Sequence, residues 1–256
     1  MGGPSSLLCV KAPLLVGLCL SFIVSGPALA QDRDTLYQVS TLGALQVGLY
    51  QPAMSIADLQ RHGDFGLGTY EGLDGEMIVD RGTVFQVPFS GRARVARARQ
   101  STPFAAVTFF DADRRFTVRR SVDLTGLGTA IDRRLTSPNY FYAIRVTGTF
   151  ASLQTRSVAK QTKPYPALAT AVAGQRTFDL RNVTGTLVGI RSPQYVGTMN
   201  VPGYHWHFIT KNGKAGGHVL QMSASGLRVA TDETRKWHVE LPQTGAFGDA
   251  GLVPGP

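Results

Sequence analysis

The amino-acid sequence predicts an α+β protein in which strands predominate and helices are few. Residues 65–87 alternate apolar and polar side chains between two turns, which is typical of a β-meander. Residues 139–153 (NYFYAIRVTGTFASL) form a long alternating segment, as expected for a strand with one face toward a core. The dipeptide Asn212-Gly213 is a strong β-hairpin signal. Together these observations favour a fold built on β-sheets.

The other elements are predicted from local composition, in chain order. Residues 35–50 mix β-branched and aromatic residues and predict a strand, a turn and a second strand. Residues 55–62 predict a short helix with Ser55 as its N-cap and Gly63 just past its end. Further strands are expected within residues 104–111, 115–122, 177–190 and 219–241, and helices within 124–135 and 163–173.

The first 30 residues predict a signal peptide. Lys11 supplies the positive charge, residues 13–24 are apolar, and residues 28–30 (ALA) form a cleavage pattern. The apolar run is short for a membrane span. We therefore expect a periplasmic or secreted protein with no stable membrane association after cleavage. Both cysteines fall in this segment, so the mature chain would have no disulfide and no thiolate ligand.

A composition shift near residues 154–166 predicts the boundary between two domains. We place the N-terminal domain at residues 31–155 and the C-terminal domain, which contains most of the histidines, at residues 156–247. Residues 248–256 are predicted to be a flexible tail.

The formal net charge is +9, and its basic residues cluster in short runs such as RARVARAR at residues 92–99. Nucleic-acid binding would use such runs. Here the basic residues alternate with Ala, Val and Phe, as on half-exposed strands. We therefore expect no nucleic-acid partner, and a positive field that attracts small anionic substrates.

A histidine-rich segment, residues 204–219 (YHWHFITKNGKAGGHV), is predicted to form a β-hairpin. Residues 202–209 and 218–222 have the composition of strands on either side of the turn at Asn212-Gly213. With this dipeptide at the tip, the numbers of paired residues sum to about 425. The turn therefore predicts the register of the two strands.

This register brings three histidines together. His207 and His218 would be directly opposite, with their Cβ atoms about 4.5–5.5 Å apart. His205 lies two residues from His207 and faces the same side of the sheet. Three imidazoles on one face are the ligand set of a Zn²⁺ site with an open fourth position. A bulge at Gly216-Gly217 would shift the register by one residue and separate them.

Two charged residues outside the hairpin are further candidates. Glu76 follows the turn Asp74-Gly75 at a strand start, where a solvated turn residue is the ordinary alternative. Arg156 ends a long strand, and its guanidinium fork suits a substrate carboxylate, although a polar strand end is equally ordinary. GxSxG, HExxH, GxGxxG and P-loop patterns are absent from the sequence, which excludes the common hydrolase, zincin and nucleotide sites.

Several short motifs accompany the histidines along nearly the whole mature chain. In this combination, over residues 35–247, the sequence resembles the α-acetolactate decarboxylases. The motifs are Gly68-Thr69-Tyr70, Leu73-Asp74-Gly75-Glu76-Met77, Thr102-Pro103-Phe104, Phe141-Tyr142-Ala143-Ile144-Arg145, Thr155-Arg156, Lys163-Pro164-Tyr165-Pro166, Gly185-Thr186-Leu187-Val188-Gly189, Pro202-Gly203-Tyr204-His205-Trp206-His207-Phe208 and Gly216-Gly217-His218-Val219.

The resemblance implies a zinc-dependent carboxy-lyase that converts 2-acetolactate, a small 2-hydroxy-3-keto acid, to acetoin and CO₂. It also implies two domains, each built on a mixed, mostly antiparallel β-sheet, and a homodimer. Zinc would chelate the ketone and hydroxyl oxygens of the substrate. The family's zinc ligands fall on His205, His207 and His218, its proton-donating glutamate on Glu76, its carboxylate-holding arginine on Arg156 and its substrate-contacting threonine on Thr69.

The C-terminal region departs from the family pattern. Family members carry a second active-site glutamate beyond the segment that matches Leu241-Pro242, whereas the last glutamate here is Glu240. This departure favours an alternative, an exported metal-binding or small-acid-binding protein that keeps the fold without the reaction. A third hypothesis is a zinc hydrolase with Glu76 as its general base.

Overall fold

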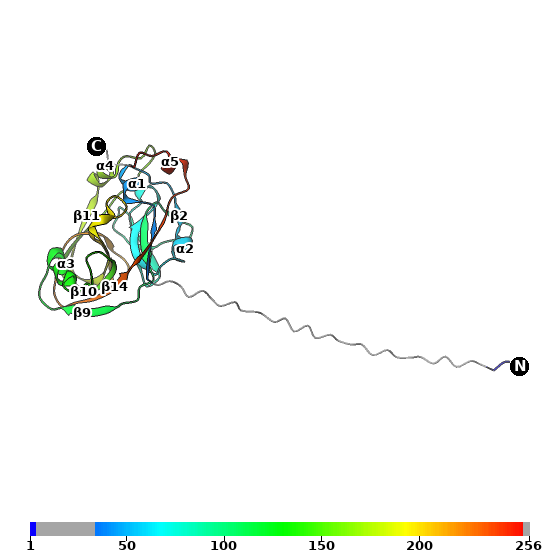
Figure 1. The fold of residues 1–256 in the computed structure, drawn as a ribbon, viewed down its shortest axis with the longest axis horizontal. Coiled ribbons are helices and arrows are strands. Elements are labelled where there is room, and N and C mark those ends of the chain that lie inside the picture. Colours follow the sequence, from blue (N-terminus) through cyan, green and yellow to red (C-terminus); the bar gives the residue numbers. More distant parts are fainter. Residues whose placement is uncertain (4–33, 253–256) are drawn as a thin grey trace. The chain divides into compact units, whose positions relative to one another are not determined.

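Two large β-sheets and a few short helices make up the described chain (Figure 1), so the α+β prediction is confirmed. The computed structural model describes residues 1–3 and 34–252. Nearly all of the predicted signal peptide, including both cysteines, lies outside the described residues, as do residues 253–256 of the predicted tail. Both sheets belong to the unit Asp32–Pro256.

The first sheet has the strand order β15-β1-β8-β3-β4-β5-β6. It contains the predicted meander, β3 to β5, and only its pairing of β1 with β15 is parallel among the described strands. That pairing joins the first and the last of the described strands. The strands are β1 Thr35–Val39, β3 Phe65–Thr69, β4 Glu76–Asp80, β5 Thr83–Val87, β6 Arg94–Val95, β8 Ala105–Thr108 and β15 Lys236–Glu240.

The second sheet has the order β11-β12-β13-β10-β14-β9, and an additional β10–β11 pairing closes four of its strands into a ring. β10 pairs with β14 along its first half and with β13 along its second half. All of the described pairs in this sheet are antiparallel. The strands are β9 Arg114–Val118, β10 Phe141–Ser157, β11 Arg176–Ser192, β12 Gly203–Thr210, β13 Gly216–Ala224 and β14 Leu227–Thr234.

One predicted strand is wrong. The second half of residues 35–50 forms helix α1, because the hydroxyl of Thr41 accepts a hydrogen bond from the Ala44 N–H and caps a helical turn. The helix predicted after Ser55 is confirmed with Ser55 as its cap, but it ends at Leu59 with Gln60 as its C-cap, so the predicted end before Gly63 is wrong. The helices are α1 Leu42–Gln46, α2 Ile56–Leu59, α3 Leu124–Asp132, α4 Leu168–Ala173 and α5 Gly245–Gly248, with 3₁₀ turns η1 Glu71–Leu73 and η2 Gln194–Val196, and β2 Met54–Ser55 pairs with β7 Ser101–Thr102.

The described helices are short. None of them combines the length and the apolar character that crossing a bilayer requires. α1 and α4 lie side by side near one end of the sheets (Figure 1) and share a small apolar cluster.

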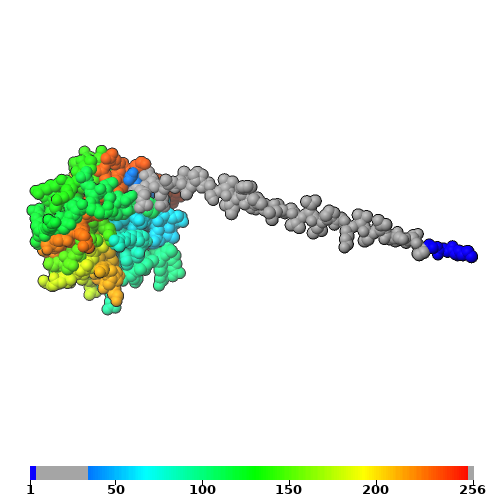
Figure 2. Space-filling view, turned by 90° about the horizontal axis from the view of Figure 1, so that it is seen from below, coloured from blue at the N-terminus to red at the C-terminus, as the bar shows by residue number. Residues whose placement is uncertain are grey.

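The two sheets pack against each other through a common apolar core. Leu67 and Ile78 of the first sheet lie in one buried cluster with Val188 and Ile209 of the second. A bridge between Arg92 and Ala215 continues this contact at the surface, where Figure 2 shows the cyan to blue-green segment beside the orange one. The packing places β4 against β12 and β13, which contain the three candidate histidines.

The predicted domain boundary between residues 155 and 156 falls inside β10, whose ladder with β11 continues through both residues. Strand β10 is therefore continuous across the predicted boundary, and the division into two domains stays a prediction.

Candidate metal centre

The hairpin register is confirmed. β12 and β13 pair His207 directly with His218, and the ladder continues through Gly217 and Gly216 without a shift. His205, two residues from His207, faces the same side of the sheet, and the three rings lie 5.0–5.3 Å apart between centroids. A strong local turn signal was therefore enough to predict a cluster of three side chains.

The geometry of the three histidines fits a metal ion. One ligand nitrogen from each of His205, His207 and His218 lies within 4.8 Å of the others. His205 Nε2 and His218 Nδ1 are 3.2 Å apart. Two nitrogen ligands of a tetrahedral zinc ion, at about 2.0–2.1 Å from it, lie about 3.3 Å apart. In addition, His207 Nε2 is buried without a hydrogen-bond partner among the described residues, as expected for a nitrogen that serves as a metal ligand.

A backbone carbonyl orients the most buried of the three rings. His207 is 1% exposed, and its Nδ1 lies 2.7 Å from the carbonyl oxygen of Met77. A carbonyl only accepts, so Nδ1 carries the proton and the lone pair of Nε2 is free for a metal. Sequence reasoning missed this contact, because a main-chain carbonyl has no residue signature.

The three imidazoles are held neutral. Burial, and to a smaller extent the neighbouring Arg156 guanidinium, lower the pKa of His205 to about 4. Burial, followed by the neighbouring His205, lowers the pKa of His207 and of His218 well below 6.5. A neutral imidazole is the form that binds a metal. For the same reason, the 3.4 Å contact between His207 and Glu76 is not an ion pair at neutral pH.

Glu76 lies at the beginning of β4 and points at the histidines. Its Oε2 is 3.4 Å from His207 Nε2, and its Oε1 accepts a hydrogen bond of 3.2 Å from Arg156 Nη1. The residue before it, Gly75, has a φ of +85°, and a Cβ there would collide with the Val87 carbonyl oxygen. Glycine has no Cβ, so the chain at the beginning of β4 can pack closely against the end of β5. This close packing sets the direction of the Glu76 side chain.

The environment of Glu76 changes its acidity. Its side chain is buried, and burial raises its pKa to about 7, while the Arg156 guanidinium opposes that rise. Glu76 is a buried carboxyl group in contact with one cation and one neutral imidazole, not a solvated one. The structure therefore contradicts the ordinary alternative that we considered for Glu76.

Arg156 lies opposite His218 in the ladder between β10 and β13. A register shift between Gln154 and Thr155 in this ladder sets the position of Arg156 relative to β13. The buried hydroxyl of Thr155 donates a 3.0 Å hydrogen bond to the Gly216 carbonyl, which ties β10 to the strand that contains His218. Spacing along the sequence gave no signal for this role of Thr155.

Thr69 lies directly opposite Glu76 in the β3–β4 ladder and is buried. Its hydroxyl donates a 2.8 Å hydrogen bond to the Gly75 carbonyl. The hydroxyl proton is therefore used within the protein, and its oxygen lone pairs are left for a ligand. All of the predicted site residues thus come together in one place.

Two other histidines lie elsewhere in the described chain. The rings of His62 and His238 both stack on Tyr37, with centroids 3.7 Å and 4.9 Å from it. Neither belongs to the histidine cluster.

Comparisons with known proteins agree with this geometry. A family model described as alpha-acetolactate decarboxylase matches residues 36–254. An alpha-acetolactate decarboxylase of Methanosarcina mazei is 47% identical over 219 residues, which cover 86% of this chain and 76% of that protein. One of Methylococcus capsulatus is 42% identical over 225 residues, covering 88% and 86%. The crystal structure of alpha-acetolactate decarboxylase from Bacillus subtilis superposes with a TM-score of 0.83 at 35% identity and covers 85% of this chain and 93% of that one.

Proposed function

Since the chain belongs to the alpha-acetolactate decarboxylase family and is a carboxy-lyase, we propose that it converts 2-acetolactate to acetoin and CO₂ at a zinc ion held by three histidines. The cluster of His205, His207 and His218, with Glu76 and Arg156 beside it, supports this proposal. A bound zinc ion supplies Lewis acidity that draws electron density from a substrate ketone.

The reaction breaks the bond between a carbon atom and its carboxylate. The electron pair of that bond passes toward the neighbouring ketone, and one proton must be added to carbon to form acetoin. The protein must therefore hold the carboxylate in a fixed orientation while the bond breaks. After CO₂ has left, it must supply a proton to the carbon atom.

Arg156 holds the carboxylate. It lies beside His218, and only one of its terminal nitrogens is engaged by Glu76 in a described hydrogen bond. The rest of the guanidinium fork remains to bind two carboxylate oxygens and to orient the bond that breaks.

Glu76 donates the proton. Its carboxyl group lies between His207 and Arg156, so it faces the same space as the metal ligands and the carboxylate site. Thr69, its cross-strand neighbour, would accept a hydrogen bond from the substrate through its free oxygen lone pairs. Related branched 2-hydroxy-3-keto acids carry the same oxygen atoms and belong to the proposed substrate class.

We further propose that the protein is exported and forms a homodimer. The charged, apolar and small-residue segments of residues 1–30 support export to the periplasm or medium. N-terminal sequencing of the exported protein should begin near Gln31, and light scattering should give twice the chain mass.

Acetoin formation from racemic acetolactate, measured with and without a chelator and alongside metal analysis, tests the proposed reaction. We expect chelator-sensitive acetoin production and about one zinc per chain. Bound zinc without acetoin would instead indicate a protein that keeps the metal site without the reaction. Ester cleavage without acetoin would indicate a hydrolase.

A further inference from the structure

A cleft of about 550 Å³ opens at the edge of the contact between the two sheets. It lies among the β4–β5 turn, the middle of β10 and β11, and the β12–β13 turn. Its lining includes neither the three histidines nor Glu76 and Arg156, so it is a different site from the metal centre. Its volume is in the range of small-molecule binding sites.

The charges in this cleft are not balanced. Its one carboxylate, Asp80, accepts 2.7 Å and 3.1 Å hydrogen bonds from Arg145, one on each oxygen. This pair is neutral as a unit. Arg81, Lys211 and Arg228 also line the cleft, and within the described chain their side chains make no hydrogen bond or ion pair. Three cations therefore face one space without a protein counter-charge.

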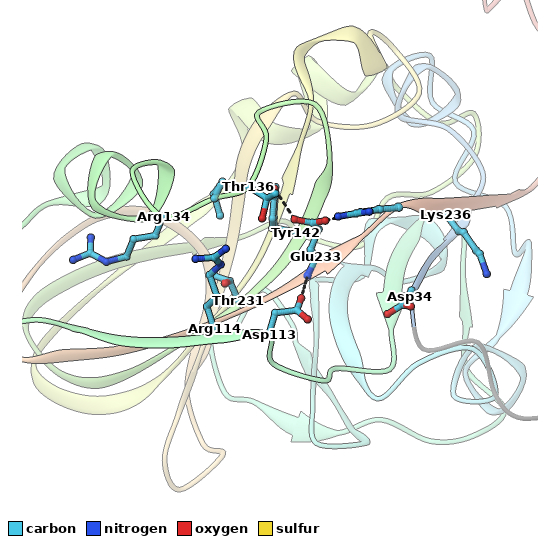
Figure 3. Close-up of a pocket in the computed structure, with 11 residues that line it drawn as sticks. Asp34, Asp113, Arg114, Arg134, Thr136, Tyr142, Thr231, Glu233 and Lys236 are labelled. Carbon is cyan, nitrogen blue, oxygen red and sulfur yellow. Dashed lines mark hydrogen bonds and ion pairs between the residues drawn. The ribbon is translucent and has the colours of Figure 1, made fainter.

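A second pocket, of about 630 Å³, differs from the cleft in the balance of its charges (Figure 3). It also has several basic residues, but three carboxylates, of Asp34, Asp113 and Glu233, line it as well. Glu233 pairs with Arg235 at 2.6 Å, and Figure 3 shows Asp113 against the backbone N–H of Glu233. Three carboxylates face four basic residues in that pocket, so its excess of positive charge is smaller than that of the cleft.

The conformation of Arg81 is a second, independent observation. Asp80 pairs with Thr83, so Arg81 and Gly82 form a two-residue hairpin turn, and their φ angles are +53° and +74°. Such a turn favours Asn, Asp or Gly at its first position. An arginine there is strained, and strained residues concentrate at binding sites.

The floor of the cleft supplies hydroxyl groups. Arg228, Thr147 and Thr186 lie side by side in one row across β14, β10 and β11 and share one face of the sheet. Within the described residues, the hydroxyls of Thr147 and Thr186 have no hydrogen-bond partner, although Thr186 is only 9% exposed. Hydroxyl donors beneath guanidinium groups suit the oxygen atoms of a phosphate.

We propose that this cleft is a second ligand site, which binds a small phosphate-bearing dianion between Arg81, Arg228 and Lys211 above Thr147 and Thr186. The site acts independently of the metal centre.

Inorganic phosphate titrated into the holoprotein by calorimetry, at low and constant ionic strength, tests the proposal. We expect saturable binding at one site per chain. Arg228→Gln and Arg81→Asn should each weaken binding about tenfold or more, since each removes a charge-assisted contact. Thr186→Val keeps the net charge and should also weaken binding. Arg81→Asn should at the same time raise the melting temperature, because Asn tolerates the left-handed turn.

Two controls locate the phosphate. Arg114→Gln removes the same charge from the second pocket and should leave phosphate affinity unchanged. His207→Ala should also leave it unchanged, which separates the cleft from the metal centre. Equal weakening by Arg114→Gln would show nonspecific attraction, and loss in His207→Ala would place the phosphate on the metal. Either result, or the absence of saturable binding, would overturn the proposal.

Discussion

The Nδ1 atom of His207 lies 2.7 Å from the carbonyl oxygen of Met77, the residue that follows Glu76 in β4. One strand of the first sheet therefore orients a candidate metal ligand of the second sheet and supplies the acidic residue beside it. The spacing between acid and ligand depends on the packing of the sheets, so mutations that move β4 should disturb both.

His207→Ala should abolish both zinc binding and acetoin formation, because the two remaining imidazoles leave an incomplete ligand set. Metal content by mass spectrometry and acetoin production measure the two effects. His238→Ala is the matched control, since that ring stacks on Tyr37 outside the cluster. It should keep both properties. Full zinc content in His207→Ala would exclude His207 as a ligand.

Glu76→Gln should keep the metal and lower kcat about 10²- to 10⁴-fold, the usual range for loss of a general acid. The amide has the same shape, so the three histidines stay in place. Single-turnover kinetics and metal analysis separate the two effects. Glu71→Gln, which changes an exposed glutamate hydrogen-bonded to Ser101, should leave kcat unchanged. Normal kcat in Glu76→Gln would rule out its proposed role.

Arg156→Lys should lower kcat/KM about 10- to 100-fold, because an ammonium keeps the charge but loses the fork that orients a carboxylate. Steady-state kinetics with acetolactate measure the change. Arg176→Lys is the control, as Arg176 lies at the exposed start of β11. If both variants behave alike, Arg156 contributes charge alone.

Gly75→Ala should destabilise the protein by roughly 2–5 kcal/mol, the sum of a left-handed backbone and an overpacked contact with Val87. It should also lower activity by displacing Glu76. Gly82→Ala is the matched control, because Gly82 has a φ of +74° and open space around it. It should cost only about 1–2 kcal/mol and keep activity. Urea unfolding measures the free energy of unfolding of both variants. Equal losses of stability in Gly75→Ala and Gly82→Ala would show that the Val87 contact is unimportant.

The contribution of Asp232 to stability should fall as the pH rises through the range from about 4 to about 7. Burial raises the pKa of this carboxyl from 3.8 to about 7, with the carboxylates of Asp113, Asp34 and Asp111 adding to the rise and the Asp111 N–H opposing it. The folded state therefore holds a proton that the unfolded state has lost in this range, and that stabilisation disappears above pH 7.

Asp232→Asn should remove this one contribution to the pH dependence and raise the melting temperature above pH 7. Its amide oxygen still accepts the hydrogen bond from the Asp111 N–H. Asp179→Asn, which neutralises an exposed carboxylate on β11, should leave the profile unchanged. Melting curves between pH 4 and 8 distinguish these outcomes, and a profile identical to wild type in Asp232→Asn would refute the assignment.

Short-range signals in the sequence determined the elements of the site. The turn at Asn212-Gly213 set the register that pairs His207 with His218, because a hairpin turn and its two strands are neighbours along the chain. Ser55 likewise marked the start of its helix through a local hydrogen bond. Such features depend on a few adjacent residues, so composition and spacing are sufficient to predict them.

The contacts between these elements depend on long-range packing, which appears only in the folded structure. Glu76 and Arg156 are 80 residues apart, and their contact requires the two sheets to pack face to face. The Met77 carbonyl that orients His207 is 130 residues away and has no side-chain signature. Helix α1 also has a long-range contact, because the N–H groups of Leu42 and Gly43 donate hydrogen bonds to the carbonyls of Met199 and Thr198. Long-range pairing depends on the burial of whole faces, which no local pattern specifies, and that burial sets the chemistry of this site.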